Sequence, residues 1–130
     1  MKVGKLGYGY VALTSFMYLF FAIWCTLMPG STSKAIGFSF PLSSGLSEYF
    51  VVYGGFELSL AIFGIWACFK KEWIEPTLIL FVIQFCCLAV FRIATLTFLD
   101  GDLSYAKVVG GLEVSFAFLG LFVLWMNRKV

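Results

Sequence analysis

Four long apolar runs dominate this chain and leave it few ways to fold. They cover roughly residues 7–28, 50–69, 76–99 and 106–126, and polar or Gly/Pro/Ser-rich breaks separate them. Each run has about the 20 residues that an α-helix needs to cross a ~30 Å hydrocarbon core. The chain is 62% apolar and only 12% charged, whereas water-soluble domains are ~45–50% apolar. We therefore predict one all-α domain over residues 1–130, a bundle of four transmembrane helices surrounded by lipid.

The basic residues predict how this bundle is oriented. Basic residues that flank a membrane span are retained on the cytoplasmic side, and six of them fall on one side: Lys2, Lys5, Lys70, Lys71, Arg128 and Lys129. Only Lys34 and Lys107 fall on the other side. We expect both termini in the cytoplasm and an outer loop over residues 29–49. The net charge of +2 then reflects topology, and no nucleic acid is expected as a partner.

The basic start and the first apolar run also resemble a secretory signal peptide. The run is too long for the apolar region of a signal peptide, and no small-residue cleavage site closes it before Pro29. We expect a retained first helix.

Two similar segments lie 56 residues apart: GGFELSLAIFG begins at Gly54 and GGLEVSFAFLG at Gly110. They share the pattern GGxExSxAxxG, with six identities in eleven residues. Upstream, residues 51–52 match residues 108–109 at an offset of 57, so Tyr53 is an extra residue in the first copy. We interpret this pattern as a duplicated two-helix unit, with coincidence as the alternative. Units with an even number of helices insert in the same direction, which predicts two parallel-repeated helix pairs.

The repeated motif also predicts how the helices pack. At ~100° per residue its glycines, alanine and glutamate share one helix face, and small residues let helices approach closely in lipid. We expect this face to point into the bundle, with these packing residues: Gly54, Ala61, Gly64, Gly110, Ala117 and Gly120. A second small-residue face, on Gly55, Ser59, Gly111 and Ser115, would seat the first or third helix, or another protomer.

Three ionisable residues, Glu57, Arg92 and Glu113, fall well inside the predicted spans. Each lies seven residues from the outer end of its helix, which places all three in one layer roughly 10 Å below the outer boundary. An unpaired charge at mid-span costs at least ~2.5–3.5 kcal/mol. We therefore expect Arg92 to bridge both glutamates, or to pair with one while the other is protonated. Other polar residues would extend this intramembrane layer: Tyr53, Gln84 and Thr95.

The sequence contains no histidine. This excludes histidine-ligated metal centres, bis-histidine haem and a Ser-His-Asp triad. The four cysteines, Cys25, Cys68, Cys86 and Cys87, all fall within predicted spans and form no CxxC pair, which favours a packing role. We expect no metal, no cofactor and no catalytic residue in this chain, and hence no enzyme.

The run SEYFVVYGGFELSLAIFG, followed by Arg92, Asp100-Gly101 and Glu113, resembles an uncharacterised family of small four-helix bacterial membrane proteins. That family is similar to the broader DoxX-like superfamily, and the resemblance covers most of the chain from Ser47 onward. The family pattern often has a basic residue after the Ser-Glu-aromatic step, where this chain has Phe50. The resemblance implies a bacterial inner-membrane protein that serves as an accessory subunit, with any redox centre held by a partner.

These observations favour a small accessory or assembly subunit of a homo-oligomer or larger membrane complex, in which the Glu57/Arg92/Glu113 layer is structural. The alternative is a small-molecule or proton-coupled carrier that uses the same layer as its site. Both hypotheses place the functional residues in the outer half of the membrane.

Overall fold

The computed structural model describes residues 3–128, and every regular element in this range is a helix. Four helical spans are long and apolar enough to cross a membrane, which confirms the predicted all-helical membrane fold. Three of them are single helices: α1 (Lys5–Leu27), α5 (Lys71–Phe98) and α6 (Ser104–Arg128). The remaining span, Ser43–Phe69, joins α3 (Ser43–Tyr49), the π-helix η1 (Phe50–Phe56) and α4 (Glu57–Phe69) without a break.

The connections follow from local sequence. Pro29 begins the short helix α2 (Pro29–Ile36), where its missing N–H costs no hydrogen bond. Gly37 ends α2 with φ of 90°, a left-handed conformation that glycine adopts without strain. Gly101, with φ of 112°, makes the turn between α5 and α6 in the same way.

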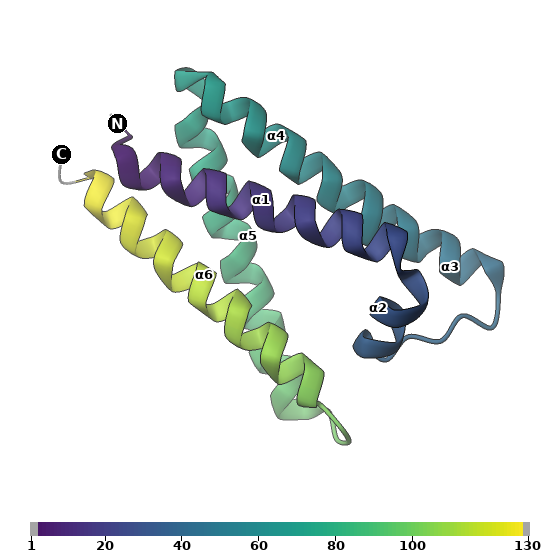
Figure 1. Ribbon diagram of the computed structural model, residues 1–130. Helices are drawn as coiled ribbons and strands as arrows, with labels where there is room; N and C mark the ends of the chain where they lie inside the picture. The colour runs from purple at the N-terminus through teal and green to yellow at the C-terminus, as the bar shows by residue number, and fades with distance from the viewer. Residues whose placement is uncertain (1–2, 129–130) are drawn as a thin grey trace.

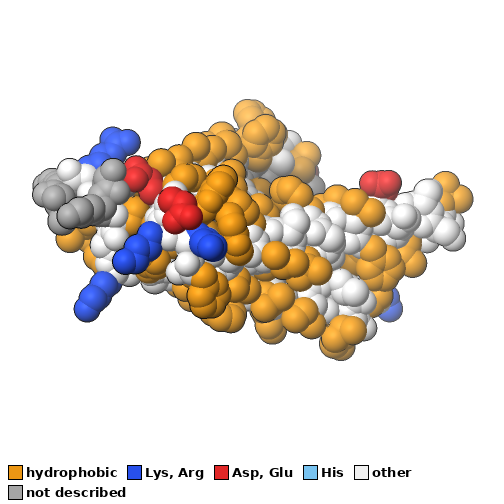
Figure 2. Space-filling model, turned by 90° about the horizontal axis from the view of Figure 1, so that it is seen from above, with side chains coloured by type: hydrophobic (Ala, Val, Ile, Leu, Met, Phe, Trp, Pro, Cys, Tyr) orange, Lys and Arg blue, Asp and Glu red, His pale blue; other side chains and the backbone are white. Residues whose placement is uncertain are grey.

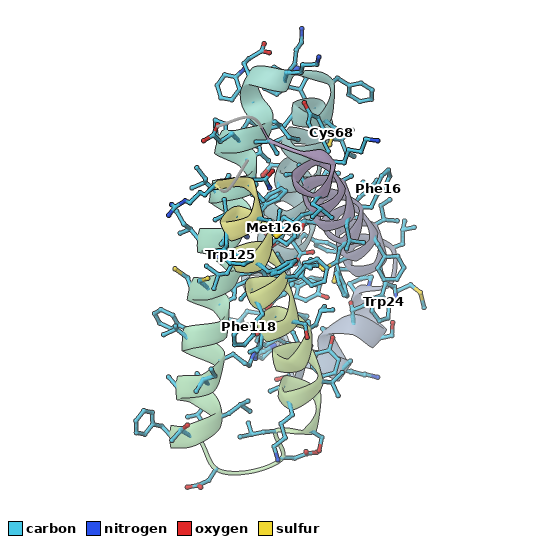
Figure 3. The ribbon with its side chains drawn as sticks, turned by 90° about the vertical axis from the view of Figure 1, so that its left-hand side faces the viewer. Phe16, Trp24, Cys68, Phe118, Trp125 and Met126 are labelled. Carbon is cyan, nitrogen blue, oxygen red and sulfur yellow. The ribbon has the colours of Figure 1, made fainter. Side chains whose placement is uncertain are left out.

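Large apolar side chains cover the outside of the spans, because in a bilayer the outer faces meet lipid. Figure 2 shows apolar side chains over the middle of the visible face and charged groups gathered towards its ends. Phe16 on α1 and Phe118 on α6 point away from the bundle (Figure 3) and are 62% and 70% exposed. This distribution is that of a multi-pass membrane protein.

The helices associate as two pairs. α1 packs along η1 and α4, and α5 packs along α6; contacts of α1 with α5 and α6, and of α4 with α5, join the pairs. No contact links α4 to α6 within the described residues. The pairs lie together at the end that carries both termini and diverge towards the end that carries α2, α3 and the α5–α6 turn (Figure 1). We name these the terminal end and the loop end.

Small residues permit the close approach of the helices. The six packing residues that the motif predicts, Gly54, Ala61, Gly64, Gly110, Ala117 and Gly120, are all buried. A Cβ on Gly120 would lie 2.6 Å from both the hydroxyl of Tyr10 and a methyl of Val82. The second small-residue face, on Gly55, Ser59, Gly111 and Ser115, is exposed, so neither α1 nor α5 covers it.

At the terminal end the interior is apolar and tightly filled. Val11, Leu78 and Phe81 have no exposed surface. The backbone N–H of Gly4 donates a hydrogen bond to the side-chain oxygen of Asn127 at 2.6 Å, which ties the start of α1 to the end of α6. The bundle is therefore closed at this end.

Candidate functional site

A two-point ion pair joins α5 to α6. Nε of Arg92 donates to Oε2 of Glu113 at 2.8 Å, and its Nη2 donates to Oε1 at 2.9 Å. The guanidinium thus binds both carboxylate oxygens, an arrangement that fixes the geometry of the pair. The side chains are 29% and 9% exposed. Of the two arrangements expected from the sequence, the structure contains the one in which Arg92 pairs with a single glutamate.

Glu57, the matching glutamate of the first motif copy, has no such partner. Its Oε2 is buried and makes no hydrogen bond to any described residue. Glu57 opens α4, immediately after the π-helix. An isolated carboxylate is costly in apolar surroundings, so this group has to take up a proton or a cation.

Tyrosines from three elements surround Glu57. Tyr18 on α1, Tyr53 on η1 and Tyr105 on α6 all lie close enough to Glu57 to interact with it electrostatically. Tyr53 and Tyr105 also lie within such reach of Arg92, as Tyr18 does of Glu113. We name the two glutamates, Arg92 and these three tyrosines the polar layer; Tyr105 is its exposed member.

Within and beside this layer, further polar groups are buried without partners. Oγ1 of Thr14, Oη of Tyr18 and Oε1 of Gln84 make no hydrogen bond to any described residue. Gln84 lies about two turns from Arg92 towards the terminal end of α5, so the polar groups continue inward from the layer. They stop at the apolar core of Val11 and Phe81.

Thr95, the last of the polar residues expected at the site, has a different place. Its hydroxyl donates to the backbone carbonyl of Arg92 at 3.0 Å, and the residue is exposed. The Thr95 hydroxyl thus makes its hydrogen bond within its own helix and does not take part in the interior layer.

The loop end covers the layer with aromatic side chains. The hydroxyl of Tyr49 donates to Oγ1 of Thr32 at 2.6 Å, which fastens α3 to α2. Tyr53 stacks on Tyr49 with ring centroids 4.9 Å apart, and Phe38 meets both rings edge-on, at 6.3 Å from Tyr49 and 5.9 Å from Tyr53. α2 also contacts α6, a helix of the other pair. We name Phe38, Tyr49 and Tyr53 the aromatic cover.

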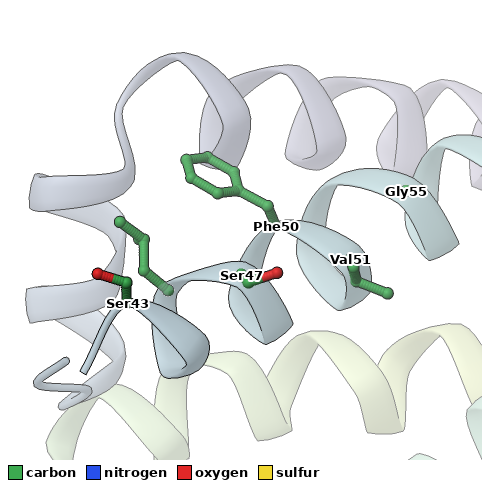
Figure 4. Close-up of a pocket in the computed structure, with 6 residues that line it drawn as sticks. Ser43, Ser47, Phe50, Val51 and Gly55 are labelled. Atoms are coloured by element: carbon green, nitrogen blue, oxygen red, sulfur yellow. The ribbon is translucent and has the colours of Figure 1, made fainter.

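Two open grooves lie away from this layer, on the surface of the second span. One, of about 530 Å³, runs along α3 and η1 past Ser43, Ser47 and Val51 (Figure 4). The other, of about 510 Å³, lies between α1 and η1. Phe50 and Gly55 line both grooves, and Glu57 lines neither.

Sequence reasoning missed Tyr18 and Tyr105 as members of the layer. A signal for Tyr18 was present on the first helix, where polar side chains recur every four residues at Tyr10, Thr14 and Tyr18. All three are buried. A polar stripe at helical spacing on a membrane helix points inward, because lipid offers its groups no partner.

No family model, no curated protein and no solved structure matches this chain. Its function must therefore be argued from the geometry of the layer. One carboxylate there is fully bound by a guanidinium, and one is buried and unpartnered.

Proposed function

We propose that this protein is a proton-coupled membrane carrier for a small molecule and that Glu57 is its binding group. One observation carries the proposal: of two glutamates in the same motif, Glu113 is held by Arg92 while the Oε2 of Glu57 is buried without a partner. A group that served only to hold helices together would have its partner in the fold. An unsatisfied carboxyl inside a membrane protein is typical of a proton or ligand site.

The divergence of the helix pairs supports the same function. The pairs diverge at the loop end (Figure 1), and the polar groups extend from there to mid-bundle. Transport then requires the pairs to part at the terminal end, where they meet through apolar contacts and the Gly4–Asn127 hydrogen bond. Packed helices that meet along apolar faces can shift between such states without breaking an ion pair.

We further propose the topology and origin that the sequence suggests. The terminal end carries Lys5, Lys70, Lys71 and Arg128, all exposed, which favours a cytoplasmic location for both termini in a bacterial inner membrane. The association of α1 with α4 and of α5 with α6 supports two parallel helix pairs that arose by duplication. The site then opens to the outer side.

Proton uptake by reconstituted protein tests the proposal. Liposomes that hold a pH-sensitive dye are acidified outside, and the fall in internal pH is followed with wild type, Glu57→Gln and Glu48→Gln. Glu48 is an exposed carboxylate on α3 and serves as the matched control. We expect Glu57→Gln to lower uptake to the protein-free rate and Glu48→Gln to leave it unchanged. Equal uptake by wild type and Glu57→Gln would contradict the proposal.

A role as an accessory or assembly subunit, as DoxX-like proteins suggest, is the second candidate. The observation that favours it is the uncovered face of the second span, where Gly55 and Ser59 are exposed and both open grooves meet at Gly55. Small residues at such a face let another helix approach closely. Purification from native membranes separates the two candidates. A stoichiometric partner that is lost in Gly55→Leu supports the role as a subunit, and a protein that purifies without a partner contradicts it.

A further inference from the structure

The π-helix before Glu57 is an unusual element that needs a cause. η1 runs over seven residues, Phe50–Phe56, inside an otherwise α-helical span. π-helices account for well under ~1% of residues in proteins and occur mostly as single turns at functional sites. The matching part of the second copy lies in α6, which is α-helical throughout Ser104–Arg128.

The sequence repeat supplies that cause. Val51 matches Val108 at an offset of 57, whereas Gly54 matches Gly110 at 56, so the first copy has one extra residue between them. A π-turn holds one residue more than an α-turn and can absorb an insertion without rotating the flanking helix faces. Exposure agrees on both sides of the insertion: the two valines are exposed and the two glycines are buried.

The insertion gives the first copy a side chain that the second lacks. Tyr53 has no counterpart in α6, and the residue that matches Tyr49 there is Ala106. Tyr53 is half-buried, stacks on Tyr49, and lies within electrostatic reach of Glu57. Tyr49 is itself held by its hydrogen bond to Thr32. The first copy thus contributes Tyr49 and Tyr53 to the aromatic cover, and the second copy has no matching tyrosine.

A second difference leaves this glutamate without a fixed cation. A Cβ on Gly110 would lie 2.8 Å from Cγ of Arg92, and a Cβ on Gly54 would lie 2.8 Å from Oγ1 of Thr26. Thr26 therefore faces the first glycine of the first motif, and Arg92 faces the first glycine of the second motif. A hydroxyl in place of a guanidinium leaves the carboxyl of Glu57 to be neutralised by something that the fold does not provide.

We infer that Tyr53 is a specificity-determining residue inserted above Glu57, and that the site takes an organic ammonium ion in exchange for a proton. This rests on the function proposed for Glu57. Tyrosine faces attract such cations when desolvated, and one free carboxylate supplies too few oxygens for a divalent metal ion. The exchange balances: the proton leaves the carboxyl of Glu57 and the cation pairs with the carboxylate, so no net charge is added.

Calorimetric titration of the purified protein with benzyltrimethylammonium tests the ligand class. We expect binding with release of one proton, loss of both in Glu57→Gln, and affinity about tenfold weaker in Tyr53→Leu. Tyr53→Phe keeps the ring face and should bind nearly as wild type. Two results would overturn this inference but not the proposed carrier. One is wild-type affinity in Tyr53→Leu. The other is no binding by the wild type while proton uptake still depends on Glu57. Binding and proton uptake that both survive Glu57→Gln would overturn the proposed function itself.

Deletion of Tyr53 tests the insertion. We expect the shortened chain to fold with a thermal midpoint near that of wild type, because η1 can return to an α-turn, and to bind the probe at least tenfold more weakly. Deletion of Val109 in α6 is the matched control, since it rotates one part of a regular helix against the other by ~100° and should abolish folding. If both deletions impair folding to the same extent, the interpretation of Tyr53 as an inserted residue is wrong.

Discussion

At the scale of single residues, Glu57 and Glu113 occupy the same position of one motif but have different bonding partners. Both begin as the glutamate of GGxExSxAxxG. Glu113 accepts two hydrogen bonds from Arg92, whereas the buried Oε2 of Glu57 has no hydrogen-bond partner among the described residues. The difference depends on the neighbouring helix, because α5 offers a guanidinium to α6 and α1 offers only the hydroxyl of Thr26 to η1.

The Arg92–Glu113 pair predicts a strongly non-additive response to mutation. Removal of one partner leaves a charge unpaired in the bundle and should lower the free energy of unfolding by about 3 kcal/mol. We therefore expect Arg92→Met and Glu113→Leu each to be destabilising. The double variant, which has no charge left to desolvate, should lie within ~1 kcal/mol of wild type. Reversible unfolding in mixed micelles measures all three, and additive losses would show that the pair is not coupled.

At the scale of elements, adjacent glycines in α6 have opposite roles. A Cβ on Gly110 would lie 2.8 Å from Cγ of Arg92, whereas a Cβ on Gly111 would meet nothing within 4 Å. The first glycine sets how closely α5 and α6 approach. The second faces outward and packs against no described side chain.

Alanine substitutions separate these roles. Gly110→Ala must displace Arg92 or part the helices, at a cost of roughly 1–3 kcal/mol. Gly111→Ala should leave the thermal midpoint unchanged or raise it, since alanine favours the helix by up to ~1 kcal/mol. Thermal unfolding of the two variants in the same detergent checks this. A midpoint for Gly110→Ala at or above that of Gly111→Ala would show that the close approach is unimportant.

Much of the fold could be predicted from the sequence because lipid imposes simple rules. The length of the apolar runs predicted the four spans, and the spacing of Gly54, Ala61 and Gly64 predicted a helix face that is buried in the structure. The Arg92–Glu113 ion pair agrees with the similar depth that counting residues along each helix predicts for these two side chains. These features depend only on helical geometry and on the cost of polar groups in hydrocarbon.

Other features depend on which helices become neighbours, and counting cannot reveal that. Arg92 could reach either glutamate from its depth, and it pairs with Glu113 because α5 packs along α6. The π-helix was visible in the sequence only as the extra Tyr53, since no residue type specifies a π-turn. Tyr105 lies near the layer because α6 begins one residue before it, at the loop end.

At the scale of the whole molecule, the two ends of the bundle differ in character. The terminal end is closed by Val11, Leu78 and Phe81 and by the Gly4–Asn127 hydrogen bond. The loop end holds the diverging pairs, the polar layer and the aromatic cover. A molecule closed at one end and polar towards the other presents its lone carboxyl to one side of the membrane.

The most direct measurement of this account is the reaction of the native membrane protein with an apolar carbodiimide. The reagent enters the bilayer and activates protonated carboxyl groups, and peptide mass spectrometry then shows which glutamates are modified. We expect Glu57 to be modified and Glu113, which is bound on both oxygens by Arg92, to remain unmodified. Arg92→Met should make Glu113 reactive as well. Modification of Glu113 in wild type at the same rate as Glu57, or faster, would contradict the division of roles between the two glutamates.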